Sequence, residues 1–342
     1  MRIQRLLPVF LAIFMITITS SLSAQTVTGS IGGTVTDTTG AVVPNAQITA
    51  HNIATGIDTQ ATSNGAGIYS IRFLPIGQYE VTVQAPGFAS AKLPAFALEV
   101  DQTVKFDAHL QTGGATTTVD VKGDVAPILN TNDPTLGTTF TANTVRNIPL
   151  NGLDFSALTL YTPGTVPTYG TQGPTSIERS TFNSDIPNIN GNRAQANNYT
   201  LDGIDLNETQ NNLIGYSPAP ESLQEIRILS ANSPADYGNV NGGGVVSVLK
   251  SGTNSFHGSA YGYTQNANYN ANSWANNHAN PIVPIRSFSQ SQFGGTFGGP
   301  ILRDKLFFFV DYLGARYHQG GLEQDSVFTQ AMRNGEIGRA HV

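Results

Sequence analysis

Cysteine is absent from this 342-residue chain, and only 12% of its residues carry a charge. Without cysteine the protein has no disulfides, no thiolate catalyst and no lipid anchor on an N-terminal cysteine. The scarcity of charge argues against helical bundles, whose surfaces are rich in Glu and Lys. Glycine, with 36 residues, is abundant instead. This composition favours β-structure with many turns.

Positive charge is also scarce, with 17 Lys and Arg against 23 Asp and Glu, a net charge of −6. Two of the basic residues, Arg2 and Arg5, belong to the N-terminal leader described below. The rest of the chain therefore has 15 basic and 23 acidic residues, a net charge of −8. No basic patch stands out, so we expect no nucleic-acid partner.

Catalytic motifs are missing as well. The sequence has no HExxH motif and no group of His, Asp and Glu at catalytic spacing. Between residues 29 and 110 the only histidines are His51 and His109, and each is expected to be an exposed strand residue. The Gly-rich stretch Gly242–Ser251 is not a P-loop, because Leu249 stands before Lys250 where that motif needs glycine. We expect no enzyme activity, no catalytic residue, no cofactor and no metal site.

The N-terminus has the pattern of a secretory leader. Arg2 and Arg5 precede an apolar run from Leu6 to Ile18, and small and polar residues follow as far as Ala24. We predict a signal peptide over residues 1–24, cleaved between Ala24 and Gln25. The alternative, an uncleaved signal anchor, is disfavoured because the run is shorter than the roughly 18 residues of a membrane helix. The mature protein is therefore expected to be exported, and either soluble or barrel-forming.

Residues 25–112 alternate apolar and polar side chains between strong turn signals. Tyr79, Val81 and Val83 share one face of a predicted strand, whereas Glu80 and Thr82 share the other. About seven short strands of this kind predict a small β-sandwich with one buried core, large enough to fold without disulfides.

Two segments carry a family resemblance, GSIGGTVTDTTGAVVPNAQITA and SNGAGIYSIRFLPIGQYEVTVQAPGF. They resemble the carboxypeptidase-regulatory-like domain, which implies a transthyretin-type sandwich over residues 25–112. In this family the module is an accessory of exported proteins and carries no active site.

Residues 124–252 have a different character. A short amphipathic helix is predicted at Leu153–Leu160, because Pro163 and Gly164 follow it. The polar stretch Val166–Ile189 is predicted to be a loop. Further on, an apolar run at Ser222–Ala231, a Gly/Asn-rich turn and three valines from Val245 predict a strand–turn–strand element.

Two clusters that contain acidic residues in this region have a functional interpretation. A calcium site is one interpretation of a cluster of oxygen ligands, Asp202, Asp205, Asn207 and Glu208. The spacing is not that of an EF-hand, so a turn between strands is favoured. Glu221 and Glu225 suggest paired catalytic carboxylates, but on a helix they would share a solvated face.

Residues 253–335 contain three longer, aromatic-rich runs: Ser255–Thr264, Ser289–Phe297 and Leu306–Tyr317. Their length suits outer-membrane strands of about 9–11 residues. Between the first two lies Gln265–Arg286, Asn-rich and containing Trp274, which is typical of a long extracellular loop.

Three further motifs carry a second resemblance: PLNGLDFSALTLYTPG, NGNRAQANNYTLDGIDLNE and SLQEIRILSANSPADYGNVNGGGVVSVLKSGTNSFHGSAYGY. Together they resemble the plug domain of TonB-dependent outer-membrane receptors, in particular the Oar-like group, in which the same sandwich precedes the plug. The resemblance implies a mainly β fold: sandwich, mixed α/β plug at 124–252, and the first strands of a barrel at 253–335. Only three such strands are predicted, too few to close a barrel, so we expect an N-terminal fragment of a receptor.

The same resemblance implies function, location and partners. It implies ligand binding and energy-coupled uptake at the bacterial outer membrane, with the sandwich in the periplasm. The implied partners are the TonB complex of the inner membrane, outer-membrane lipid and an extracellular ligand, with an iron complex, a carbohydrate or a peptide all left open. Residues 113–123 form a linker, in which a TonB-contacting segment is expected at Thr117, Thr118, Val119, Asp120 and Val121.

Two other expectations complete the sequence reading. The alternative function is that of a secreted or cell-surface adhesin or carbohydrate-binding protein built on the sandwich, which exposed aromatic strands disfavour. Residues 336–342, Glu-Ile-Gly-Arg-Ala-His-Val, are interpreted as a non-native tail from a translated sequencing adapter.

Overall fold

The computed structural model describes residues 27–113, 118–120, 135–148, 150, 153–166, 187–209, 212, 214–233, 237–238, 241–285, 287–320 and 330–333. The predicted leader, its cleavage site Ala24–Gln25 and the predicted tail lie outside these residues. The chain forms two compact units, Met1–Gly258 with Thr296–Val310, and Ser259–Gly295 with Asp311–Val342. None of the helices in the described part has the length and hydropathy that a membrane crossing requires.

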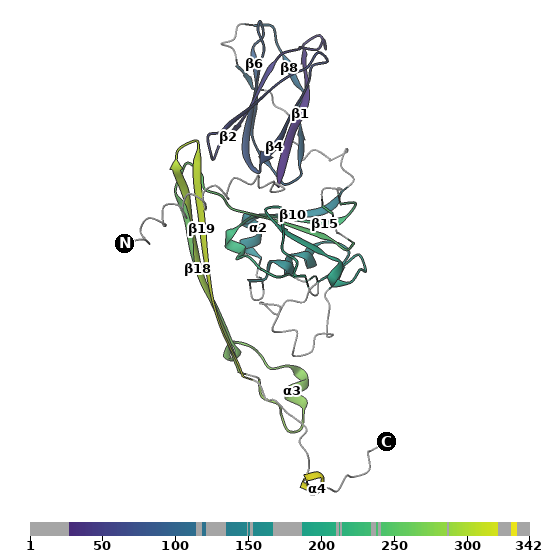
Figure 1. Ribbon diagram of the computed structural model, residues 1–342, viewed down its shortest axis with the longest axis vertical. Coiled ribbons are helices and arrows are strands. Elements are labelled where there is room, and N and C mark those ends of the chain that lie inside the picture. Colours follow the sequence, from purple (N-terminus) through teal and green to yellow (C-terminus); the bar gives the residue numbers. More distant parts are fainter. Residues whose placement is uncertain are drawn as a thin grey trace, which may run out of the picture. The chain divides into compact units, whose positions relative to one another are not determined.

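The predicted sandwich is present, with its strands in two sheets (Figure 1). One sheet has the order β4-β1-β7, with β8 also paired to β1, and the other has the order β3-β2-β5-β6-β9. The strand bounds are β1 Thr28–Asp37, β2 Gln47–Asn52, β3 Asp58–Thr62, β4 Ile68–Pro75, β5 Gly77–Gln84, β6 Ser90–Leu98, β7 Thr103–Lys105, β8 Ala108–Leu110 and β9 Thr118–Asp120.

Alternation of side chains explains the sandwich core. Tyr79, Val81 and Val83 on β5 are at most 2% exposed, as their period of two predicts. They pack in a single buried cluster with residues of the facing sheet, among them Ile31 and Val35. Burial of this kind contributes about 1.5–3 kcal/mol per large aliphatic side chain, which accounts for a fold without disulfides.

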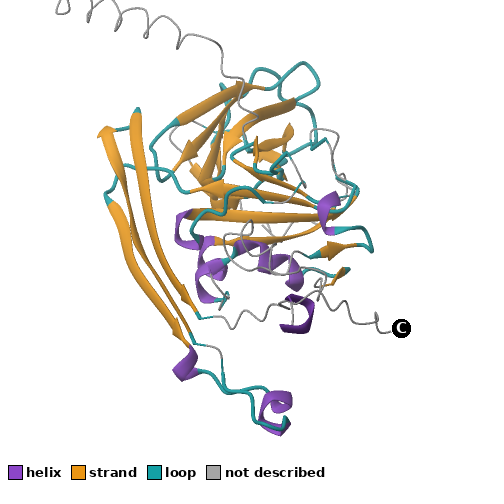
Figure 2. Ribbon diagram, turned by 60° about the horizontal axis from the view of Figure 1, so that its bottom comes forward, coloured by secondary structure: helices purple, strands orange, loops and turns teal. Residues whose placement is uncertain are grey.

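The plug is a five-stranded sheet of order β10-β15-β16-β13-β14, with the short helices on one side of it (Figure 2). Its strands are β10 Leu136–Thr141, β13 Asn198–Leu201, β14 Ile204–Asp205, β15 Leu223–Ala231 and β16 Gly244–Leu249. A separate two-stranded ladder joins β11 Thr165–Val166 and β12 Asn188–Ile189. The helical turns are α2 Ala142–Asn147, η2 Phe155–Tyr161, η3 Ala194–Ala196 and η4 Pro220–Ser222.

The helix predicted at 153–160 is a 3₁₀ helix, η2, rather than an α-helix. It begins at Phe155 because the side chain of Asp154 accepts a hydrogen bond from the Ser156 N–H, which caps the first turn. Phe155 and Leu158 are fully buried against the plug sheet, in contact with Tyr199 and Ile226.

The three predicted barrel strands form one sheet of order β17-β18-β19. They are β17 His257–Asn266, β18 Phe288–Leu302 and β19 Leu306–Gln319, so the second and third are longer than predicted. The segment between β17 and β18 contains η5 Ala267–Tyr269 and α3 Trp274–His278, and α4 Gln330–Arg333 follows β19. In Figure 2 the strands are drawn in orange and α3 in purple.

Candidate coupling and docking site

The central part of the predicted TonB-contacting segment is a strand at the edge of the sandwich. Thr118, Val119 and Asp120 form β9, while Thr117 and Val121 lie outside the described residues. β9 runs parallel to β6, with Ser90 opposite Thr118, Ala91 opposite Val119 and Lys92 opposite Asp120. Among the described strands β6 is the sole partner of β9, which leaves its other edge open.

The turn that follows the C-terminal end of β6 contacts the plug. β6 ends at Leu98, and the turn that follows places Val100 at 0% exposure. Val100 belongs to a small buried cluster with Leu229 of β15 and with Val246 and Val248 of β16. The sandwich core is a separate cluster, so Val100 packs on plug residues outside that core, and Val27 and Ile76 of the sandwich also pack against this small cluster.

Polar contacts surround this buried valine. The Val100 N–H donates to Oε1 of Glu225 at 2.9 Å, and the Arg227 guanidinium donates to the Val100 carbonyl oxygen. The Tyr237 hydroxyl donates to the carboxylate of Asp101, which lies 3.9 Å from Arg227. Glu225, Arg227 and Leu229 alternate along β15, so all three face the sandwich turn. Both backbone groups of Val100 are thus satisfied by plug side chains.

Glu225 carries an unusual charge environment. The pKa of its carboxyl is raised to about 7, chiefly by burial and to a smaller extent by the nearby carboxylates of Glu99 and Asp101. The hydrogen bond from Val100 and the charge of Arg227 act in the opposite direction. Desolvation is the largest of these effects, because Glu225 is only 5% exposed.

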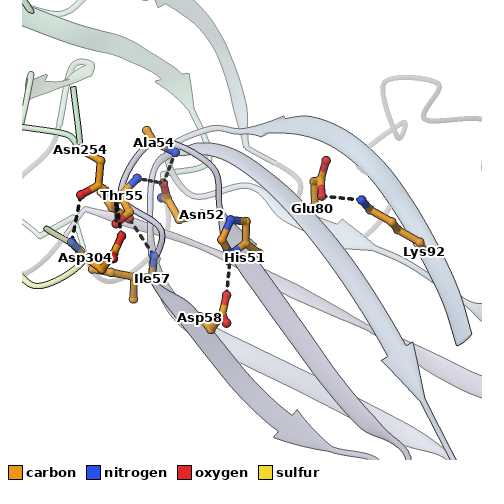
Figure 3. Close-up of polar contacts among 10 residues, drawn as sticks. All are labelled: His51, Asn52, Ala54, Thr55, Ile57, Asp58, Glu80, Lys92, Asn254 and Asp304. Atoms are coloured by element: carbon orange, nitrogen blue, oxygen red, sulfur yellow. Dashed lines mark hydrogen bonds and ion pairs between the residues drawn. The ribbon is translucent and has the colours of Figure 1, made fainter. Parts of the chain in front are cut away.

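A second contact joins the sandwich to the turn between β18 and β19 (Figure 3). The Asn254 N–H donates to the Ala54 carbonyl at 2.9 Å, and its side-chain Nδ2 donates to the Thr55 carbonyl at 2.7 Å. Nδ2 also donates to Oδ1 of Asp304 at 2.6 Å, and the Asp304 N–H donates to the Asn254 Oδ1 at 2.9 Å. Asn254 thus connects three segments that are far apart in the sequence.

The sandwich turn is shaped for this contact before it meets Asn254. The side chain of Asn52 accepts hydrogen bonds from the N–H groups of Ala54 and Thr55, which fixes the β2–β3 turn (Figure 3). Gly56 has φ +70°, and a Cβ there would lie 2.3 Å from Oδ1 of Asp304. Glycine is therefore required both by the backbone conformation and by the close approach.

Aromatic side chains gather at the same end of the sheet β17-β18-β19. Phe256 stacks on Phe297 with ring centroids 5.9 Å apart, and Phe308 lies 5.6 Å from Phe297. Phe256 and Phe297 are nevertheless 66% and 49% exposed. These rings form an apolar surface on the strands, as outer-membrane strands require near an interface.

The predicted long loop also carries exposed aromatic residues. Trp274 is 75% exposed and stacks on His278 at 4.1 Å, within the short helix α3. Tyr269 is 78% exposed. The loop is less irregular than predicted, because η5 and α3 interrupt it.

The two glutamates considered as paired carboxylates are not solvated. The alternative interpretation put Glu221 and Glu225 on a solvated helix face, but they are only 4% and 5% exposed. Glu221 lies in the short turn η4 and Glu225 in strand β15, because the apolar alternation from Leu223 onward is that of a strand. Lys250, which the rejected P-loop reading contained, donates its Nζ to the Glu221 carbonyl oxygen.

The Asp202 region is the predicted turn. Asp202 and Gly203 have φ +50° and +81° and connect β13 to β14. Such a two-residue connection with positive φ at both positions is typical of a tight hairpin. Among the described residues no group of three or more His, Asp or Glu could hold a metal ion.

His51 and His109 lie on strands, as predicted, but His51 has a partner that the sequence did not reveal. Its Nδ1 lies 2.6 Å from Oδ1 of Asp58, directly across the β2–β3 pair (Figure 3). His109 lies beside Thr36 at 2.8 Å.

Three family models match successive parts of the chain. The carboxypeptidase regulatory-like domain matches residues 30–111, the TonB-dependent receptor plug domain residues 138–245, and the outer membrane beta barrel domain residues 248–341. The chain thus has the domain order of a TonB-dependent outer-membrane receptor. The plug and barrel domains indicate the outer membrane as its location.

The chain is also similar to a curated relative and, over about half of its length, to two solved outer-membrane proteins. The TonB-dependent transporter Oar of Myxococcus xanthus is 24% identical over 264 residues, 73% of this chain and 23% of its own length. This chain therefore spans about a quarter of that relative. The siderophore receptor PirA of Acinetobacter baumannii is 18% identical, covering 54% of this chain and 24% of that one, at a TM-score of 0.38. The outer membrane transporter YddB of Escherichia coli is 17% identical, covering 53% and 26%, at a TM-score of 0.39.

Sequence reasoning did not identify the residues that join the modules of this TonB-dependent receptor. Val100, Glu225 and Asn254 were each assigned to a local element, and their partners lie 125 and 199 residues away in the sequence. One signal was available for Asn254. It follows a Ser-Gly-Thr stretch at the end of the plug strands, where a short polar segment has to cross to the next module.

Proposed function

We propose that this chain is part of a receptor that binds an extracellular ligand and takes it up across the outer membrane with energy from the TonB complex. The order of its modules supports this proposal, since a plug follows the sandwich and barrel strands follow the plug. In such a receptor the plug would block the lumen of the barrel, and its work would be binding and gated transport rather than covalent chemistry.

The observation that carries the proposal is the position of β9. A strand at a sheet edge with one side open can accept a strand from another protein through main-chain hydrogen bonds. β9 lies between the sandwich and the plug in the sequence, where a pull on it would reach the plug. We therefore propose Thr117–Val121 as the segment that TonB captures. The sandwich would then lie in the periplasm.

Fractionation tests the receptor proposal. The full-length gene product should pellet with outer membranes and show heat-modifiable migration, because closed barrels resist unfolding in detergent. Recovery as a soluble protein in the medium would contradict the proposal and favour an adhesin.

A substitution tests the coupling segment. Proline at Val119 and Val121 removes two N–H donors from the strand, so capture by the C-terminal domain of the host's TonB should be abolished. The matched control is proline at Thr59 and Ala61 of β3, an edge strand at the opposite end of the same sheet. Capture that survives the Val119 and Val121 changes would remove this assignment.

A further inference from the structure

Strand β6 connects the coupling strand with the plug. Its first residues, Ser90 to Lys92, pair with β9, and the turn after its last residue inserts Val100 into the plug. A load on β9 therefore has two routes to the plug. One is the covalent chain between Asp120 and Leu136, and the other is the ladder from β9 to β6 and onward to the Val100 turn.

The contact at the Val100 turn can transmit force to the plug, because several interactions hold it. It combines a buried apolar side chain with the hydrogen bonds to Glu225 and from Arg227. Both of these plug residues lie on β15, the strand next to the sheet's edge, and β15 pairs with β10 and β16. Movement of the turn therefore acts on an interior strand of the plug sheet and not on an edge strand.

The Asn254 contact gives the sandwich a second point of support. The β2–β3 turn is held by Asn254 and Asp304, which belong to the crossing segment and to the β18–β19 turn. The sandwich therefore contacts the plug at one turn and the barrel strands at another. If a pull displaces one of these two contacts, the sandwich rotates as a rigid body about the other.

We propose that the sandwich is a lever: β9 stays paired with β6 when TonB pulls, the sandwich turns about its Asn254 support, and the Val100 turn moves β15 of the plug. This inference rests on the proposed function, since it describes how a captured β9 would act. It assigns a mechanical role to the sandwich and names the residues at which load enters and leaves it.

The readout is the opening of the plug in the outer membrane of the host. Ser247 is 0% exposed in β16, and its hydroxyl has no hydrogen-bond partner in the described structure, so Ser247→Cys should be tolerated. The 342 residues contain no cysteine, so fluorescein maleimide labelling above that of the receptor without Ser247→Cys reports this position. The comparison is between energised cells in their growth medium and cells treated with a protonophore. Energised cells should label severalfold faster.

The first arm separates the two routes. About ten Gly/Ser residues inserted between Asp120 and Leu136 add slack of roughly 35 Å, which would disconnect a direct covalent pull. The lever predicts that energised labelling survives this insertion. It also predicts that Val100→Asp abolishes the energised increase, because the carboxylate would be buried against Leu229, Val246 and Val248. The control Glu99→Gln changes the charge of the neighbouring residue and should leave the increase intact.

The second arm tests whether β9 stays on β6. Lys92 and Asp120 are register partners, and a disulfide between cysteines at these positions would lock β9 to β6. The matched control joins Thr82 and Lys92, which are register partners on β5 and β6, and leaves β9 free. Both pairs lose the Lys92–Glu80 ion pair (Figure 3), so that loss is common to the two variants and cannot explain a difference between them. The lever predicts energised labelling in both oxidised variants.

Each of the following outcomes would contradict the lever or the proposed function. Labelling lost in the 92–120 disulfide and kept in the 82–92 control would show that β9 leaves β6, which overturns the lever. Labelling lost on insertion but kept in Val100→Asp would assign the load to the covalent linker and also overturn it. No energised increase in the parent, or an increase that proline at Val119 and Val121 leaves unchanged, would contradict the proposed function itself.

Discussion

The sandwich and the sheet β17-β18-β19 are built from the same alternation, yet their apolar faces have different environments. In the sandwich a second sheet covers the face, and Val81 is 0% exposed. In the other sheet Val310 is 57% and Tyr312 64% exposed, and the three strands have no second layer among the described residues. The pattern thus specifies a strand and its two faces, whereas the environment of each face depends on what packs there.

The largest predicted effect comes from substitutions that place an acidic side chain on each of the two apolar faces. Val81→Asp places a carboxylate in the sandwich core and should cost at least about 4 kcal/mol, enough to remove most protection from β5. Val310→Asp makes the same change on an exposed strand face and should leave the sandwich unaffected. Hydrogen-exchange mass spectrometry of the peptide 77–84 measures both variants. Equal protection of this peptide in the two variants would refute the distinction.

Much of the fold follows from the sequence for the same reason. Period-two patterns over a few residues predicted the sandwich strands and the strands after residue 253. The same pattern predicted the strand that contains Glu225, because Ile226 and Ile228 alternate with Arg227. A helical placement of Glu221 and Glu225 does not agree with that alternation.

The contacts between modules could not be predicted in this way. The burial of Glu225 arises from Val100, which lies 125 residues earlier in the sequence. The parallel pairing of β9 with β6 is also non-local, and a three-residue strand has too short a pattern to fix its partner. Such contacts depend on the shapes of two folded surfaces, which a sequence pattern within one element does not contain.

A pH experiment tests the contact between the Val100 turn of the sandwich and Glu225 of the plug. The pKa of Glu225 is raised from its ordinary 4.5 to about 7 in the docked state, so docking is strongest when the carboxyl is protonated. The contact should be fully stable below pH 4.5, weaken by up to about 3 kcal/mol as the pH rises to 7, and change little above that.

Exchange of the Val100 amide hydrogen measures this docking directly, because the N–H donates to Glu225. Glu225→Gln keeps an acceptor and removes the titration, so the ratio of the two exchange rates cancels the intrinsic pH dependence. Wild-type protection should fall relative to Glu225→Gln between pH 4.5 and 7. A constant ratio would show that Glu225 is not desolvated by the sandwich turn.

The smallest predicted effect lies where the two compared regions meet. Gly56→Ala strains a residue at φ +70° and brings a methyl group against Asp304, whereas Gly87→Ala strains a residue at φ +85° with nothing within 4 Å. Both changes should cost the sandwich about 1–2 kcal/mol, because alanine tolerates this backbone region poorly. Only Gly56→Ala should also accelerate exchange of the Asn254 amide, which donates to Ala54. Equal exchange of the Asn254 amide in both variants would mean that the close approach at Asp304 is relieved at no cost, and the support assigned to this contact would then be lost.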